Sequence, residues 1–151
     1  MIEIERKFLV NSNEYKNKAH KSVKIVQGYL SKDPERTVRI RISDDRGFIT
    51  IKGISSDDGL SRYEWEKEIP LAEAKELISI CLPTIIEKFR FEVYYKNILF
   101  EVDEFEGAHE GLVVAEVELE NTQKEIELPD WIGKEVTGNK KYYNAVLSNS
   151  E

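Results

Sequence analysis

The sequence has few of the residues that build several common kinds of site. Its single cysteine, Cys81, excludes an internal disulfide and a zinc site made of several cysteines. Only two histidines are present, His20 and His109; neither has the spacing of a metal ligand, and nothing supports a Ser-His-acid triad. A glycine-rich phosphate loop is absent as well. These absences leave the charged side chains as the main carriers of any chemistry.

Long apolar runs and a surplus of positive charge are also missing. No apolar stretch approaches the ~20 residues of a membrane-spanning helix, and Glu3 and Glu5 interrupt any N-terminal targeting pattern. The formal net charge is −7, which disfavours nucleic acid and anionic membranes as partners. We therefore expect a soluble, cytoplasmic protein with one domain over residues 1–151.

What the chain does have is alternation of apolar and polar residues, which is typical of strands. Turn signals at 44–47 ("DDRG") and 96–97 ("KN") predict hairpins. Because the strands follow one another with short gaps, they predict an α+β, mainly β fold with an antiparallel sheet that curls or closes. The eight expected strands are 2–10, 23–31, 36–43, 47–54, 60–70, 85–95, 98–105 and 111–120.

Three helical segments are expected between and after these strands. Apolar residues recur at helical spacing over 71–82, which predicts a helix that Pro83 ends and that buries Cys81. The stretch "ELPDWIG" at 127–133 predicts a short helical turn. Asn139 is a suitable cap for a final helix that ends near Leu147.

The polar face of the expected strands carries charges that are sorted by sign. Arg39 and Arg41 share one strand, whereas Glu116 and Glu118 share another. For any one strand, a solvated face explains such residues. Like charges two positions apart lie about 6–7 Å from one another and repel, so the sorting across several strands indicates a compensating ligand. If the sheet closes, these charges line its interior, where eight strands leave room for one small ligand.

A lining of this kind predicts a metal-bound oligophosphate as the ligand. Arginine and lysine side chains hold phosphate oxygens, and arginine does so with two parallel hydrogen bonds. Clustered carboxylates hold a hard divalent cation such as Mg²⁺ or Mn²⁺. The same combination favours phosphoryl transfer, since cations spread along the phosphates and a metal acts at the reacting oxygens.

The charged segments, taken in order, resemble those of the CYTH superfamily, the triphosphate tunnel metalloenzymes. They are "EIERKFL" at 3–9, "QGYL" at 27–30, "RIR" at 39–41, "TIK" at 50–52, "LSRYEWE" at 60–66, "EKFR" at 87–90, "FEVD" at 100–103, "EVE" at 116–118 and "VTGNKKYYN" at 136–144. The resemblance covers nearly the whole chain. It implies an eight-stranded closed antiparallel barrel that forms a tunnel, in agreement with the alternation.

The resemblance also implies roles for individual residues. The metal ligands, for Mg²⁺ or Mn²⁺, are Glu3, Glu5, Glu116 and Glu118, which together with Lys7 are the expected catalytic residues. The substrate-binding residues are Lys7, Arg39, Arg41, Lys52, Arg62, Lys88, Arg90 and Lys140, and the supporting residues are Tyr29, Glu64, Glu66, Glu101 and Asp103. Tyr29 belongs either to the tunnel or to the barrel core. Asn139 and Lys141 depart from the Asp and Arg that related short bacterial sequences tend to have.

The leading hypothesis for the function is hydrolysis of inorganic tripolyphosphate to pyrophosphate and phosphate. A class IV type adenylate cyclase is an alternative, and so is hydrolysis of an organic triphosphate such as thiamine triphosphate. A non-catalytic sensor of polyphosphate or nucleotides is a third, but it is expected to lose the metal-binding carboxylates, and all four are present. The resemblance is compatible with a homodimer.

Overall fold

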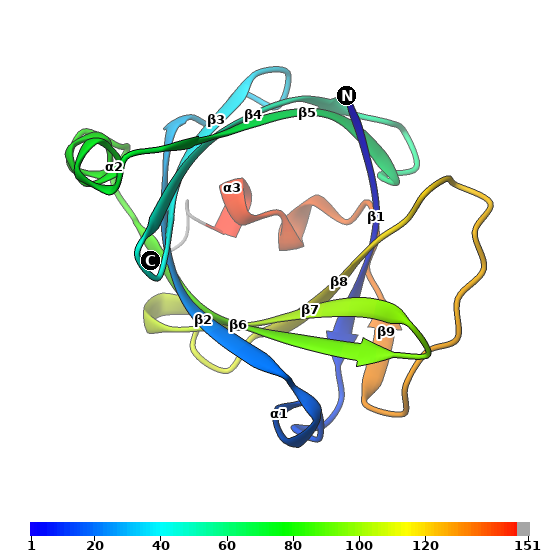
Figure 1. Ribbon diagram of the computed structural model, residues 1–151. Helices are drawn as coiled ribbons and strands as arrows, with labels where there is room; N and C mark the ends of the chain where they lie inside the picture. The colour runs from blue at the N-terminus through cyan, green and yellow to red at the C-terminus, as the bar shows by residue number, and fades with distance from the viewer. Residues whose placement is uncertain (148–151) are drawn as a thin grey trace.

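The alternating segments form one antiparallel sheet in the computed structural model, which describes residues 1–147 (Figure 1). Its strands follow the order β5-β4-β3-β2-β6-β7-β8-β1-β9, and β5 also pairs with β1, so eight strands close into a barrel. The strands are β1 (Ile2–Val10), β2 (Lys21–Ser31), β3 (Thr37–Ser43), β4 (Arg46–Ser55), β5 (Ser61–Ile69), β6 (Ile86–Tyr95), β7 (Ile98–Phe105), β8 (Val113–Glu118) and β9 (Ile132–Glu135). The expected closed antiparallel barrel is confirmed.

The helices are short and lie around and inside this ring. They are α1 (Tyr15–Lys18), α2 (Leu71–Ser79) and α3 (Asn144–Leu147), together with the 3₁₀ helices η1 (Gly107–His109) and η2 (Lys140–Tyr142). In Figure 1, α2 and α1 lie outside the barrel, whereas η2 and α3 are seen within the ring. Within residues 1–147, no helix has the length and apolar character needed to cross a membrane.

The register of the strands decides which side chains face the interior. Lys7 of β1 pairs with Glu116 of β8, which in turn pairs with Glu101 of β7. Arg90 of β6 pairs with Asp103 of β7. Side chains of paired residues point to the same face of a sheet. The charged positions of neighbouring strands are therefore in step, and closure of the sheet encloses them.

The apolar core lies on the outer side of the barrel wall. Phe8, Phe100 and Trp131 are almost fully buried in one cluster that α1 and β9 help to cover. On another side, α2 packs against β3 and β4, where Ala74 is fully buried. A Cβ atom on Gly47 would lie 2.5 Å from the Cβ atom of Ala74, so glycine permits this close approach.

The helical turn predicted at 127–133 is reduced to a single turn, in which Ile132 N–H donates to Pro129 O at 3.1 Å, and the chain then continues as a strand. Residues Ile132–Glu135 form β9, which pairs with β1, and Asn11 N–H donates to the carbonyl oxygen of Trp131 at 2.9 Å. The buried indole of Trp131 holds this segment against the barrel. A strand of four residues is too short to show alternation, so local sequence gave no sign of the pairing.

Two expected helices differ in extent. Helix α2 ends at Ser79 because the next residues turn toward the sheet, where Leu82 N–H donates to Tyr29 O at 2.8 Å. Cys81 therefore lies beyond the helix and is half-buried beside Gly28. The expected final helix is broken into η2 and α3. Asn139 does act as a cap, since its side chain accepts a hydrogen bond from Lys141 N–H.

Candidate active site in the barrel lumen

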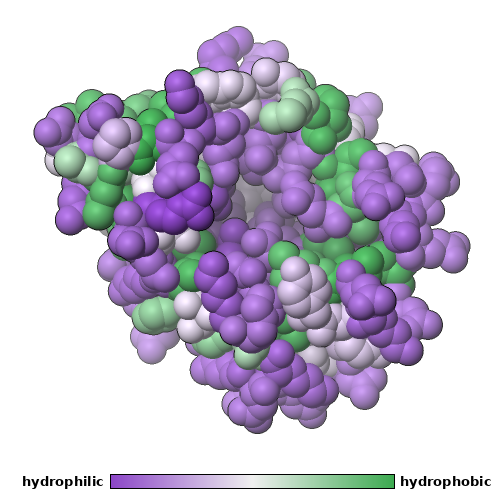
Figure 2. All heavy atoms as spheres, viewed as in Figure 1, coloured by the Kyte–Doolittle hydropathy of each residue, from purple (hydrophilic) through white to green (hydrophobic). Residues whose placement is uncertain are grey.

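The interior of the barrel contains a cavity lined mainly by charged and polar side chains. Figure 2 shows the molecule hollowed at the centre, with hydrophilic residues around the opening. The expected residues that line the cavity are Glu3, Glu5, Lys7, Tyr29, Arg39, Lys52, Arg62, Lys88, Arg90 and Glu116. Tyr29, which the sequence placed either in the tunnel or in the core, is a buried residue of this lining. Residues from seven strands therefore meet at one place.

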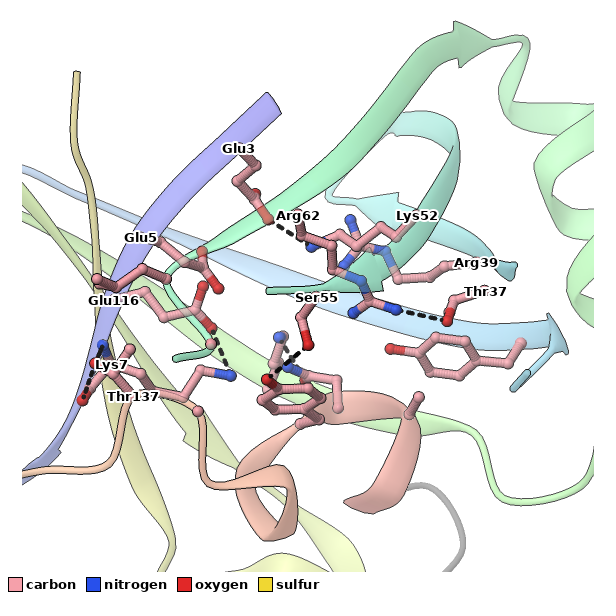
Figure 3. A pocket seen from close by; sticks show the side chains of 18 of the residues that line it. Glu3, Glu5, Lys7, Thr37, Arg39, Lys52, Ser55, Arg62, Glu116 and Thr137 are labelled. Carbon is pink, nitrogen blue, oxygen red and sulfur yellow. Dashed lines mark hydrogen bonds and ion pairs between the residues drawn. The ribbon is translucent and has the colours of Figure 1, made fainter. Parts of the chain in front are cut away.

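One wall of the cavity is basic and comes from β3, β4 and β5. Lys52 Nζ lies 3.0 Å from Glu3 and 3.4 Å from Glu64. The guanidinium of Arg39 donates to Thr50 Oγ1 at 3.2 Å, and that of Arg62 donates to Thr37 Oγ1 at 2.8 Å. Figure 3 shows these three cationic groups grouped on the side opposite Glu5 and Glu116. These neutral hydroxyl partners help to orient the two arginines, and Arg39 has Glu66 as a further, charged partner at 3.5 Å.

A second basic group comes from β6 and is held by a buried carboxylate. Asp103 lies 2.8 Å from Lys88 Nζ and makes two hydrogen bonds, of 2.8 and 3.0 Å, with the guanidinium of Arg90. Burial, followed by repulsion from Arg90, lowers the pKa of Lys88 to about 8 despite the opposing effect of Asp103. Burial alone would raise the pKa of Asp103, but Arg90 and Lys88 outweigh it and lower that pKa.

The carboxylates of β1 and β8 form the acidic part of the lining. Burial, and then the charges of Glu116 and Glu3, raise the pKa of Glu5 well above its usual range. Burial acts in the same sense on Glu116, but Lys7, Arg90 and Lys88 outweigh it and lower the pKa of Glu116 well below the usual range. The two carboxyl groups are hydrogen-bonded, and Figure 3 shows them pointing toward one another. Of the two carboxyl groups, that of Glu5 is therefore the one that more readily takes up a proton.

The acidic part of the lining is suited to a hard divalent cation by its chemistry. All its donors are carboxylate oxygens, which Mg²⁺ and Mn²⁺ prefer. A bound cation would compensate the repulsion between the two carboxylates when both are ionised, which is the repulsion that raises the pKa of Glu5 in its absence. Within residues 1–147, however, no group of three or more His, Cys, Asp or Glu side chains lies close enough together to hold a metal. Glu3 is a further carboxylate of the same cavity, and its ion pair with Lys52 would have to yield on metal binding.

Several expected residues lie outside this cavity. Arg41 and Glu101 line a second cavity, and Arg90 lines both. Glu66 contacts Arg39 at 3.5 Å and Arg41 at 3.4 Å, which makes it a supporting residue, as Glu64 is for Lys52.

Two further expected site residues, Glu118 and Lys140, are not among the residues that line the cavity. Glu118 is exposed at the end of β8 and does not line the cavity. Its pKa is nevertheless raised, first by partial burial and then by the negative charge of Glu3. Lys140 is exposed in η2, and its side chain is not part of the lining either. The break between η2 and α3 turns Tyr143 and Asn144 toward the lumen in place of Lys140.

The structure adds lining residues that sequence reasoning missed, namely Thr37, Ser55, Thr137, Gly138 and Tyr143. Ser55 lies on the lumen side because the pairing of β4 with β5 shifts between Lys52 and Ser55, so simple alternation from Lys52 fails. Thr37 was detectable, because it has the same parity as Arg39 and Arg41. Tyr143 lies in an irregular tail without any periodic signal.

A closed antiparallel barrel with basic and acidic groups in its lumen defines a class of proteins that bind anionic ligands inside a tunnel. The CYTH domain family matches residues 1–148, and the chain belongs to this family. The sequence is 45% identical over 146 residues to an inorganic triphosphatase of Acetivibrio thermocellus. The aligned region covers 96% of this chain and 92% of that protein.

Two further comparisons agree with this family. The chain is 34% identical over 152 residues to an inorganic triphosphatase of Nitrosomonas europaea, with 98% of this chain and 97% of that protein covered. The solved structure of the inorganic triphosphatase NE1496 is similar to this fold, with a TM-score of 0.69 at 31% sequence identity. The superposition covers 99% of this chain and 95% of that chain.

Proposed function

We propose that this protein hydrolyses a linear triphosphate in the barrel lumen, and that inorganic tripolyphosphate is the preferred substrate. The observation that carries the proposal is the juxtaposition, in one cavity of the barrel lumen, of a basic wall and the carboxylates of Glu5 and Glu116. The names of the two relatives described above support it, because both are inorganic triphosphatases that match over nearly their whole length.

The basic residues would bind the phosphate chain from two sides. Arg39, Lys52 and Arg62 lie on one wall, and Lys7, Lys88 and Arg90 lie on β1 and β6. Arginine can bind two phosphate oxygens at once, whereas lysine contributes a point charge. In an enclosed site these preorganised cations stabilise the charge that spreads over the transferred phosphoryl group.

The carboxylates would hold the cation and handle the proton of the attacking water. Glu5 and Glu116, joined by Glu3, would bind Mg²⁺ or Mn²⁺, which when bound neutralises phosphate charge and lowers the pKa of water. In hydrolysis, water oxygen bonds to a terminal phosphorus, the bond from that phosphorus to the bridging oxygen breaks, and the water gives up a proton. We assign the acceptance of that proton to the carboxylate of Glu5, which would be ionised beside the bound cation.

The test is phosphate release from tripolyphosphate, ATP and pyrophosphate with Mg²⁺, with Mn²⁺ and with a chelator. We expect fast, metal-dependent release from tripolyphosphate and slow release from ATP. Formation of cyclic AMP from ATP by the pure protein would instead establish the cyclase. Equal rates with ATP and tripolyphosphate would contradict the inorganic preference.

Glu5→Gln tests the carboxylate assignment and has a matched control. We expect the variant to lose at least about 100-fold in rate, typical of removing a general base. Glu127→Gln is the control, because Glu127 is exposed, pairs with the exposed Lys96 and is not part of the cavity lining. Its rate should equal that of the wild type. If Glu5→Gln retains full activity, Glu5 has no part in the reaction.

A further inference from the structure

Residues 136–147, here called the C-terminal segment, are fixed to the barrel at both ends. At the start, Val136 N–H donates to Lys7 O at 2.8 Å, and Lys7 N–H donates to Thr137 Oγ1 at 3.0 Å. At the other end, Leu147 is buried in an apolar cluster with Ile86, Phe105 and Val114. The segment between these anchors therefore lies against one end of the lumen, as Figure 1 shows.

From this position the segment supplies neutral oxygen atoms to two lumen lysines. Asn144 Oδ1 accepts hydrogen bonds from Lys88 Nζ at 2.9 Å and from Gln27 Nε2 at 3.2 Å. The carbonyl oxygen of Tyr142 accepts a hydrogen bond from Lys7 Nζ at 3.2 Å. Asn144 itself lines the cavity. Neither acceptor carries a charge, so the positive charge of both ammonium groups is retained.

The contacts of Lys88 account for two of its three N–H donors. Its Nζ lies 2.8 Å from Asp103 and 2.9 Å from Asn144, and its side chain is only 1% exposed. An ammonium group has three donors, so one makes no hydrogen bond to residues 1–147; Nζ lies 5.4 Å from the centroid of the Phe105 ring, and Lys88 also lines the cavity. Without Asn144, the ammonium group could rotate about its contact with Asp103, and the third donor would have no fixed direction.

We propose that Asn144, in the C-terminal segment, is a positioning residue for the substrate. Asn144 directs the free N–H of Lys88 into the lumen, where it meets the terminal phosphoryl group of the bound triphosphate. This inference rests on the proposed function and specifies it, because it assigns one end of the phosphate chain to Lys88. A neutral amide is required, since a carboxylate at this position would compete with phosphate for Lys88.

The decisive variant is Asn144→Asp, which keeps the size of the side chain and both oxygen contacts but adds a negative charge. We expect the KM for tripolyphosphate to rise at least about tenfold, as for one charged hydrogen bond lost, with kcat within about twofold. Asn144→Ala should raise the KM about tenfold as well. Val146→Ala is the matched control, because Val146 is exposed on the same helix, and it should leave KM unchanged.

Calorimetric binding of inorganic tripolyphosphate, with chelator present, gives a second readout that does not depend on hydrolysis. The two Asn144 variants should bind more weakly than the wild type while their thermal unfolding temperatures remain those of folded proteins. Wild-type KM and affinity in Asn144→Asp would overturn the positioning role, since a purely structural role predicts that result. If Asn144→Asp does not fold, unchanged KM and affinity in Asn144→Ala would overturn it equally. Absence of binding and hydrolysis in the wild type would instead refute the proposed function.

Discussion

Asp103 is the carboxylate on which two cationic groups of the lumen depend. It is 2% exposed and lies 2.8 Å from both Lys88 Nζ and Arg90 Nε. The substitution Asp103→Asn keeps the size of the side chain and removes its charge. Two buried cations would then lack their main counter-charge, although Glu101 remains 3.4 Å from Arg90.

The expected cost is large compared with that of a surface ion pair. Removal of one partner of a buried ion pair costs about 3–5 kcal/mol, because the other charge stays buried without compensation. We expect about 3 kcal/mol here, at the lower end, since Arg90 keeps Glu101 and Lys88 keeps Asn144. Glu135→Gln, which breaks the exposed pair with Arg6, should cost about 1 kcal/mol or less.

Urea denaturation at pH 7 measures both free energies of unfolding, and the pH dependence checks the cause. The pKa of Asp103 is lowered in the folded protein, so its contribution is full above the unfolded pKa of about 3.9. It is lost as the pH falls through the folded pKa, and the difference between wild type and Asp103→Asn should shrink there. A cost below about 1 kcal/mol at pH 7 would refute the view that this carboxylate holds the basic group together.

Three further perturbations follow from the same structure. Arg39→Ala should raise the KM for tripolyphosphate about 10–100-fold, as for a charged hydrogen bond lost, without lowering the urea midpoint; a variant that fails to fold would show that Arg39 is structural. Because the pKa of Lys88 is about 8, its positive charge is lost as the pH increases through that value, and the KM of the wild type should rise. Lys88→Met lacks this charge, so over the same pH range it should bind tripolyphosphate weakly at every pH. Gly59→Ala would place a Cβ atom 2.1 Å from Gly138 Cα at a φ of 75° and should cost at least about 3 kcal/mol in urea unfolding. Gly107→Ala has a φ of 66° but open space around it, so a cost of about 1–2 kcal/mol is expected, and equal costs would contradict the clash.

Local sequence could predict the barrel strands and most of the lumen because both depend on alternation. Arg39 and Arg41, or Glu3 and Glu5, occupy one parity of a strand whatever the strand pairs with. The family motifs added the expectation that these parities meet inside a closed sheet. Hairpin turns at 44–47 and 96–97 then fixed which strands are neighbours. These features are encoded within a few residues, so they are readable without coordinates.

Tertiary structure alone decided how the C-terminal part of the chain pairs with the barrel and reaches the lumen. The strand β9 exists because Ile132–Glu135 meets the edge of β1, more than 100 positions earlier, and the buried Trp131 anchors it there. In the same way, Asn144 reaches Lys88 and Gln27 only because Leu147 is anchored in a distant apolar cluster.

The sequence thus determined which residues carry charge and which face of each strand holds them. The tertiary structure decided which charges compensate one another, since the pairing of Glu5 with Glu116 and of Asp103 with two cations depends on distances across strands. It also excluded Lys140 and Glu118 from the lining, although their residue types fit the motif. The physical reason is that alternation sets the direction of a side chain, whereas its partners and its pKa depend on packing between segments far apart in the chain.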